Sequence, residues 1–428
     1  MSDAFSTRSD VVIIGAGLVG CATAYYLAKR GLSVRILDRG RVGAEQSSRA
    51  WGLLRQQGRH PAEIPLAMEA LRMWPRLPQD LGADMQLVRN GILVLAETTE
   101  DEARLTDAGR RARQHGIECR LLTPRQVTAL MPELAAGWRA GLYTPQDGHV
   151  EPVEATRAFA AAAQRLGVDI RENTPAIGIE TTGGAASGVV TPLSTFSGDA
   201  IVCVAGIGSA DVTRSLGVSL PIQRVRATVA QTHPARPVTP IPVWAPQAAF
   251  RPRADGSFYL GNGYRGIDAE HDLTLDSLRH LRAFLPTYLA TRHVVRLRIG
   301  AALIEDIRRR GTDRAQPLSE PAPNQRLVEQ NAQGFARLLP QFRDVGIARS
   351  WAGRIDATPD LIPMIGLLPS LRRYYVAAGF NGHGLALAPA VGFSLTDLIV
   401  DGQSSIDLWG LRVERYAEND FKLLRDAL

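Results

Sequence analysis

Three glycines near the start of the chain have the spacing of a dinucleotide-binding turn. The stretch VVIIGAGLVGCATAYYLAKRGLSVRILDRG, residues 11–40, places Gly15, Gly17 and Gly20 between a buried-type strand and a helix-type run. The first glycine permits the tight turn, the second lets backbone approach a pyrophosphate, and the third allows close helix–strand packing. Asp38 follows Gly20 by 18 residues, at the end of the next apolar run, where an acid can bind ribose hydroxyls. This context predicts a bound dinucleotide without saying which one.

Polar and basic residues follow that acid. The segment GAEQSSRAWGLLRQQG, residues 43–58, contains Ser47 and Ser48, which could hydrogen-bond a pyrophosphate or a ribityl chain. Two arginines in the same segment, Arg49 and Arg55, could face anionic groups. A plain surface loop is the alternative interpretation, but a nicotinamide enzyme normally has no such element at this point.

Two further glycine turns occur far along the chain. In VCVAGIGSADV, residues 202–212, a buried-type strand runs into Gly206; in AAGFNGHGLALAPAVG, residues 377–392, His383 lies between two glycines before a helix. Backbone N–H groups at that helix N-terminus could hold negative charge on a ring oxygen. Packing alone would also explain Gly206, and His383 could be a buried structural histidine.

Nucleotide-type segments therefore lie at the start, in the middle and at the end of the chain, which predicts an α/β fold with a discontinuous Rossmann-like domain. We expect residues 8–80, 146–215 and 351–428 to form the nucleotide domain. Residues 81–145 and 216–350 would form an inserted, sheet-rich substrate domain. The length of 428 residues supports two domains.

One local pattern predicts a hairpin in the second domain. The stretch QLVRNGILVLAET, residues 86–98, has apolar residues on both sides of Asn90-Gly91, a dipeptide typical of two-residue hairpin turns.

Composition narrows the class of protein. The net charge of +6 comes from 49 basic and 43 acidic residues without a basic run, which argues against nucleic-acid binding. The three cysteines, Cys21, Cys119 and Cys203, lack metal-ligand spacing, so we expect no metal site and a reducing, cytoplasmic location. The sequence shows no secretory leader and no apolar stretch of membrane-spanning length, although it leaves a peripheral membrane contact open.

The motifs together resemble those of the D-amino-acid-oxidase-like family of FAD-dependent oxidoreductases. The resemblance rests on the following stretches, in the family's order along nearly the whole chain: IIGAGLVGCATAYYLAKRG, SSRAWGLLRQQGR, EPVEATRAFAAAAQRLG, VCVAGIGSA, WAGRIDATPDLIPMIG and AAGFNGHGLALAPAVG. Within that family, the motifs most resemble those of glycine oxidases and of the β-subunit type of sarcosine, proline and opine oxidoreductases.

The resemblance implies a bound FAD and a substrate domain with a large mixed, mostly antiparallel sheet. It also implies oxidation of the C–N bond of an amino or imino acid: hydride leaves for flavin N5, and the resulting imine is hydrolysed. Carried over residue by residue, it predicts the following cofactor-binding positions: Gly15, Gly17, Gly20, Asp38, Arg39, Ser47, Ser48, Arg49, Gly206, Gly353, Gly379, Asn381, Gly382, His383 and Gly384. The predicted catalytic or substrate-orienting residues are Arg55, His383 and Arg354.

Two departures from the family pattern bear on chemistry. No cysteine stands before the TPD tripeptide, so we expect FAD to be held without a covalent bond. The carboxylate-binding arginine of glycine-oxidase-like members would fall at Ile355, one position after Arg354, and one residue changes the face of a strand.

Substrate choice and electron acceptor stay open at this level. The alternatives are a hydroxy acid in place of an amine, and a flavin subunit that works only within a hetero-oligomer. The acceptor could be oxygen or another carrier, and a homo-oligomer is equally compatible with the sequence.

Overall fold

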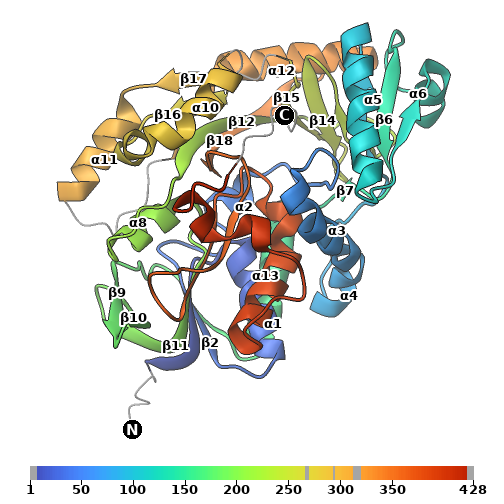
Figure 1. Ribbon diagram of the computed structural model, residues 1–428. Coiled ribbons are helices and arrows are strands. Elements are labelled where there is room, and N and C mark those ends of the chain that lie inside the picture. Colours follow the sequence, from blue (N-terminus) through green and yellow to red (C-terminus); the bar gives the residue numbers. More distant parts are fainter. Residues whose placement is uncertain (1–6, 266–268, 293–294, 312–319, 422–428) are drawn as a thin grey trace.

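Two large β-sheets organise the chain in the computed structural model, which describes residues 7–265, 269–292, 295–311 and 320–421 (Figure 1). The strands of the first sheet lie in the lower part of Figure 1, and those of the second sheet cross its upper part. No helix among the described residues is both long enough and apolar enough to cross a membrane.

The first sheet has eight strands in the described chain, with the order β19-β20-β11-β1-β2-β8 and a β9–β10 hairpin that pairs with β11. Its strands are β1 (Arg8–Ile14), β2 (Val34–Leu37), β8 (Asp169–Arg171), β9 (Gly178–Thr182), β10 (Ala185–Val190), β11 (Thr195–Cys203), β19 (Met364–Leu367) and β20 (Tyr374–Ala378). The central strands β20, β11, β1, β2 and β8 run parallel.

Both faces of this sheet are buried, as expected for parallel strands. Val11 and Ile13 pack on one face against helices, and Val12 and Ile14 pack on the other against the β9–β10 hairpin and α8 (Ser209–Arg214). The helices of the first face are α1 (Leu18–Lys29), α3 (Ile64–Met73), α4 (Leu77–Leu81), α7 (Pro152–Arg165) and α13 (Gly384–Val400). Helices α1 and α13 lie side by side (Figure 1).

The second sheet has ten strands in the described chain and is mainly antiparallel. They are β4 (Ile92–Ala96), β5 (Arg120–Leu122), β6 (Ala140–Thr144), β12 (Gln223–Thr232), β13 (Val243–Trp244), β14 (Ala248–Pro252), β15 (Phe258–Asn262), β16 (Ala269–Asp272), β17 (Val295–Arg298) and β18 (Ile347–Ala357). Phe258 and Leu260 pack under α12 (Gln325–Leu338), which leaves the alternate residues of β15 to face the first sheet.

Further helices surround the second sheet: α5 (Thr99–Gln114), α6 (Pro124–Leu130), α9 (Leu275–Arg279), α10 (Leu281–Thr291) and α11 (Ala301–Gly311). The short elements α2 (Gln46–Arg49), β3 (Leu53–Leu54) and β7 (Gly148–His149) lie where the two sheets meet.

The expected fold class is confirmed, because a parallel nucleotide-type sheet built from separated segments stands beside a large mixed sheet. The chain enters the first sheet at β1, returns at β11 and returns again at β19 and β20. The exact domain boundaries stay a prediction. Strand β18 pairs with β12 along its length, so the start of the segment assigned from 351 onward is hydrogen-bonded into the second sheet.

The hairpin predicted for residues 86–98 is wrong. Gly91 does turn the chain at φ +75°, but Val88 exchanges backbone hydrogen bonds with His149 instead of with β4. Strand β4 pairs with β6 and β13. Tertiary pairing partners therefore overrode the local turn signal.

Candidate functional site

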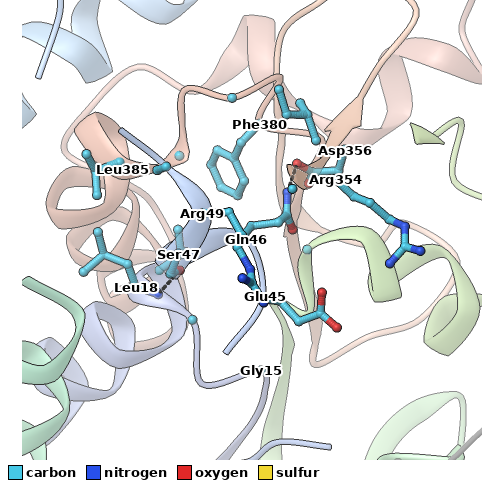
Figure 2. A pocket seen from close by; sticks show the side chains of 18 of the residues that line it. Gly15, Leu18, Glu45, Gln46, Ser47, Arg49, Arg354, Asp356, Phe380 and Leu385 are labelled. Carbon is cyan, nitrogen blue, oxygen red and sulfur yellow. Dashed lines mark hydrogen bonds between the residues drawn. The ribbon is translucent and has the colours of Figure 1, made fainter. Parts of the chain in front are cut away.

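A cavity of about 540 Å³ lies between the two sheets. Its walls come from the end of β1, the start of α1, α2, the inner faces of β12, β15 and β18, and the loop before α13. Figure 2 shows these segments converging, with Leu18 and Ser47 at one side and Asp356 and Arg354 at the other.

The glycine turn forms one end of the cavity. Gly15 has φ +113°, and a Cβ added to Gly20 would lie 1.9 Å from the Gly15 carbonyl oxygen, so a side chain at Gly20 would push α1 off the turn. Gly17 and Leu18 line the cavity, and Ser47 Oγ accepts a hydrogen bond from Leu18 N at 2.9 Å (Figure 2). The first turn of α1 has no acidic residue, and its N-cap residue, Gly17, has no side chain that could occupy the site. This end therefore suits the pyrophosphate of a dinucleotide.

Asp38 lines the same end and holds the turn together. Its carboxylate accepts hydrogen bonds from Ala16 N at 2.6 Å and Gly40 N at 2.7 Å. Burial raises the pKa of Asp38, and the two backbone N–H groups oppose that effect. Arg39 also lines the cavity and pairs with Glu45 at 3.1 Å.

Gln46 and Asp356 tie three distant segments together, and sequence reasoning assigned neither. Gln46 Nε2 donates to Asp356 Oδ1 at 2.8 Å, and Gln46 Oε1 accepts from Ile207 N at 3.1 Å. The other Asp356 oxygen accepts from Gly379 N at 2.7 Å. Gly206, at φ +54°, leaves room for Gln46, because a Cβ there would lie 1.9 Å from Gln46 Oε1. The only sign of these contacts in the sequence is the pair of glycines, Gly206 and Gly379, that accommodate them.

Among the predicted cofactor-binding residues of α2 and β18, some line the cavity and one does not. Arg49 lines the cavity beside Gly353, where an added Cβ would lie 2.7 Å from Arg49 Cβ, and it pairs with Glu320 at 2.6 Å. Ser48 is not part of the cavity wall, since its hydroxyl bonds the Ala44 and Glu45 carbonyls within its own turn.

The loop before α13 closes the wall on one side. Gly379, Asn381 and Gly382 all have positive φ, and Asn381 Oδ1 accepts from Thr358 N at 2.9 Å. Asn381, Gly382, His383 and Gly384 line the cavity. Gly20 and Gly379 lie behind the wall and shape its backbone.

Arg55 lines the cavity with no carboxylate bonded to its guanidinium among the described residues. Its guanidinium stacks on the Trp244 ring at 4.8 Å, and within the described chain it forms no ion pair or side-chain hydrogen bond. Arg59 donates from Nε and Nη2 to the Arg55 carbonyl, and its Nη1 is buried without a partner. Burial and the neighbouring Arg59 lower the pKa of Arg55 to about 10. Asp147 and Glu63 attract the Arg55 guanidinium without bonding to it, and burial raises the pKa of Asp147 to about 7, so that Asp147 is only partly ionised near pH 7.

His383 is held by a buried carboxylate. His383 Nδ1 lies 3.1 Å from Glu63 Oε1, and Glu63 is 0% exposed. Burial and then Arg59 lower the pKa of His383 to about 4, so the imidazole is neutral near pH 7. Burial raises the pKa of Glu63, but the contact with His383 and then the charge of Arg59 outweigh that effect and hold the pKa below its usual range. Sequence reasoning missed Glu63 and Trp244, for which no motif gave a signal, and it assigned no role to Arg59 although Arg59 ends the stretch SSRAWGLLRQQGR.

Arg354 and Ile355 point to opposite faces of β18. A Cβ added to Gly382 would lie 3.4 Å from Ile355 Cδ1, so Ile355 faces the loop before α13. Both residues line the cavity, and the Arg354 guanidinium, on the other face, lies 3.7 Å from Glu305 of α11. Figure 2 shows it across Gln46 and Glu45 from Ser47.

One cluster of carboxylates is close enough to resemble a metal site. Among the described residues, Asp211, Asp276 and Asp306 approach one another, but Arg214 pairs with the first two and Arg224 lies 3.7 Å from the third. Guanidinium groups thus already neutralise these acids.

A glycine turn on a parallel sheet, with a second sheet closing over it, defines a dinucleotide-dependent enzyme. The comparison with known families specifies the cofactor: the family described as FAD dependent oxidoreductase matches residues 10–398, and the chain belongs to it. The residues fit FAD, because the α1 N-terminus carries no acidic residue and the flanking glycines leave space beside it for the ADP part.

The names of the relatives describe enzymes that act on amino acids or on their N-methyl derivatives. The chain is 26% identical to glycine oxidase of Geobacillus kaustophilus, with 96% of this chain and 97% of the relative covered. It is 26% identical to sarcosine oxidase subunit beta of an Arthrobacter species, with 92% and 88% covered. It is also 26% identical to rat dimethylglycine dehydrogenase over 96% of this chain, but it spans only 45% of that relative's length. The solved L-amino acid deaminase of Proteus myxofaciens shares the fold, with a TM-score of 0.89, 23% identity, and 97% and 95% covered.

Proposed function

We propose that this protein oxidises the C–N bond of an amino or imino acid with a non-covalently bound FAD. The observation that carries the proposal is Arg55, whose half-buried guanidinium faces the cavity and is neither hydrogen-bonded nor ion-paired to a carboxylate among the described residues. A buried, unpaired charge is costly, and a substrate carboxylate would neutralise it with two parallel hydrogen bonds. The names of the relatives support an amino acid as the source of that carboxylate.

The chain's own residues would then bind and orient the substrate. Arg55, braced by Trp244 and Arg59, would hold the carboxylate. The neutral His383 would offer its Nε2 lone pair as an acceptor for the amine N–H. Arg354 is less suited to the carboxylate because Glu305 already faces it. The chemistry that FAD supplies when bound is acceptance of a hydride from the carbon next to nitrogen.

The walls around Arg55 favour a substrate with apolar bulk. Trp51, Leu53 and Trp244 line this end of the cavity. These side chains would exclude water from the reacting carbon and would contact an N-alkyl group or a large side chain. We therefore propose a secondary amine or an N-alkyl amino acid as the preferred substrate.

Location and assembly are part of the same proposal. A cytoplasmic site of action is supported by Cys21, Cys119 and Cys203, which are all free thiols and buried. An assembly with other subunits is supported by the likeness to a sarcosine oxidase subunit.

Anaerobic reduction of the purified holoprotein tests this function. N-alkyl amino acids, D- and L-amino acids and 2-hydroxy acids are added in turn, and the loss of flavin absorbance is followed. The proposal expects bleaching by one or more amino or imino acids. Bleaching by hydroxy acids alone would contradict it, and admission of air afterwards would show whether oxygen reoxidises the flavin.

A further inference from the structure

Helix α10 carries a stripe of exposed leucines. Leu281, Leu285 and Leu289 are spaced four residues apart and are 44%, 47% and 61% exposed. The adjoining side of the same helix is buried through Phe284 and Tyr288. Residues four apart share a helix face, so the three leucines form one outward-facing apolar ridge.

The neighbouring elements continue this apolar character. In Figure 1, the β16–β17 edge of the second sheet and helices α10 and α11 lie at the upper left. Together with α9, which contacts both helices, they are called here the α10–α11 lobe. Eight of the fourteen exposed large hydrophobic residues of the described chain lie in this short lobe, far more than scattered surface residues would give. Besides the ridge they are Leu278, Leu297, Ile299, Ile304 and Ile307.

Basic and acidic side chains of the lobe lie on different sides of it. Arg279, Arg282 and Arg292 are exposed around the leucine ridge. Three buried acidic residues of the lobe lie against arginines of the body instead: Asp276 against Arg214, Glu270 against Arg226, and Asp306 against Arg224. The half-buried Glu305 lies near Arg354 of the body, and Asp272 lies near Arg298 of the lobe itself. The outer face is thus apolar and basic.

We propose that the outer face of the α10–α11 lobe binds the surface of an anionic lipid bilayer. Leucines would enter the boundary between headgroups and acyl chains, while the arginines, with long stems and charged ends, would contact lipid phosphates. A second copy of this chain fits less well, because two such faces would bring their arginines together. The inference rests on the lobe alone and does not depend on the proposed reaction.

Flotation of the full-length holoprotein with vesicles tests the proposal. One set of vesicles is pure phosphatidylcholine, and the other contains equal parts phosphatidylcholine and phosphatidylglycerol. We expect the protein to float with the anionic vesicles, to bind the neutral ones weakly, and to be released by salt. The double variant Leu285→Asp/Leu289→Asp should bind the anionic vesicles at least about tenfold less tightly. The variant Arg282→Gln/Arg292→Gln should lose the preference for phosphatidylglycerol.

Leu193→Asp is the matched control, because Leu193 is 84% exposed in the turn between β10 and β11, outside the lobe. It should bind vesicles as the unchanged protein does, and flavin absorbance and circular dichroism should be the same in all variants. Absence of binding to anionic vesicles would overturn the proposal. So would equal losses in the lobe variant and the control, or an α10-dependent dimer that forms without vesicle binding.

Discussion

Glu63 and His383 lie 320 residues apart in the sequence, yet Glu63 Oε1 and His383 Nδ1 are 3.1 Å apart. An ionised carboxylate only accepts hydrogen bonds, so the proton of the neutral imidazole resides on Nδ1. Nε2 is then left as an acceptor in a residue that lines the cavity. The contact thereby sets both the orientation of His383 and the tautomer it presents.

Glu63→Gln tests this relationship. The amide has nearly the same shape but can donate as well as accept, so the tautomer of His383 would no longer be fixed. We expect kcat/KM for the amine substrate to fall about tenfold or more. The ¹⁵N shifts of His383, assigned with a His383→Asn variant, should show protonated Nδ1 only when Glu63 is present. Glu69→Gln, on α3, is the control. An unchanged histidine spectrum in Glu63→Gln would show that the carboxylate has no such role.

Arg55→Lys should raise the KM of an amino-acid substrate by at least about tenfold, because the planar, bidentate fork is lost. Arg354→Lys is the matched comparison, since Arg354 lines the same cavity but faces Glu305. Its effect on KM should stay within about threefold. Steady-state kinetics would separate the two. A KM unaffected by Arg55→Lys, with a large rise for Arg354→Lys, would exchange their roles.

Gly20→Ala should greatly weaken FAD binding. An added Cβ would lie 1.9 Å from the Gly15 carbonyl oxygen, which is backbone and cannot move away without opening the turn. We expect a loss of about 2 kcal/mol or more in cofactor binding, measured by fluorescence titration of the apoprotein with FAD. Gly346→Ala is the control, because its Cβ would meet nothing closer than 3.5 Å. Equal FAD affinity in both variants would contradict the assigned packing.

Acid should destabilise the fold between about pH 6.5 and pH 4. Burial lowers the pKa of His149 to about 3 and that of His271 and His383 to about 4. In this window the unfolded chain binds protons that the folded chain does not, so each histidine makes stability fall by up to about 1.4 kcal/mol per pH unit as pH drops. Asp147 works the other way, because its folded-state pKa is raised to about 7. Burial also raises the pKa of Asp38, Asp272 and Asp356, which act in the same direction as Asp147, so the contribution of a histidine is measured by replacing one histidine at a time.

Thermal unfolding across this pH range measures the effect. Replacing His271 by Phe should flatten the dependence of Tm on pH, since His271 is buried and ceases to titrate. His115→Gln, at an exposed position, should leave the dependence as it was. A steeper dependence after loss of His271 would reverse the assigned direction.

The parts of the fold that the sequence predicted are those set by local constraints. Gly15, Gly17 and Gly20 are tied to a turn whose geometry only small residues permit, and the helix and strand around them follow from local periodicity. The Asn90-Gly91 hairpin failed because the strand partners of a short apolar run are chosen by tertiary packing. The alternation of a strand was enough to predict opposite faces for Arg354 and Ile355, since that rule needs only two adjacent residues.

The candidate site was predicted only where glycines or motif residues marked it. Gln46, Glu63 and Asp356 are ordinary polar residues in sequence, and their importance comes from burial and from partners more than 150 residues away. Trp244 could not be predicted from the sequence either. Its contact with Arg55 joins β13 to the loop after β3, which are far apart along the chain. Such contacts follow from packing of the two sheets, which no local pattern encodes.

The central claim is tested most directly by comparing a substrate with its decarboxylated counterpart. The holoprotein is mixed anaerobically with an N-alkyl amino acid and, separately, with the matching amine that lacks the carboxylate, and the flavin absorbance is recorded. The account predicts rapid bleaching by the amino acid, much slower bleaching by the amine, and loss of that difference in Arg55→Lys. Equal bleaching by both compounds in the unchanged protein would contradict it.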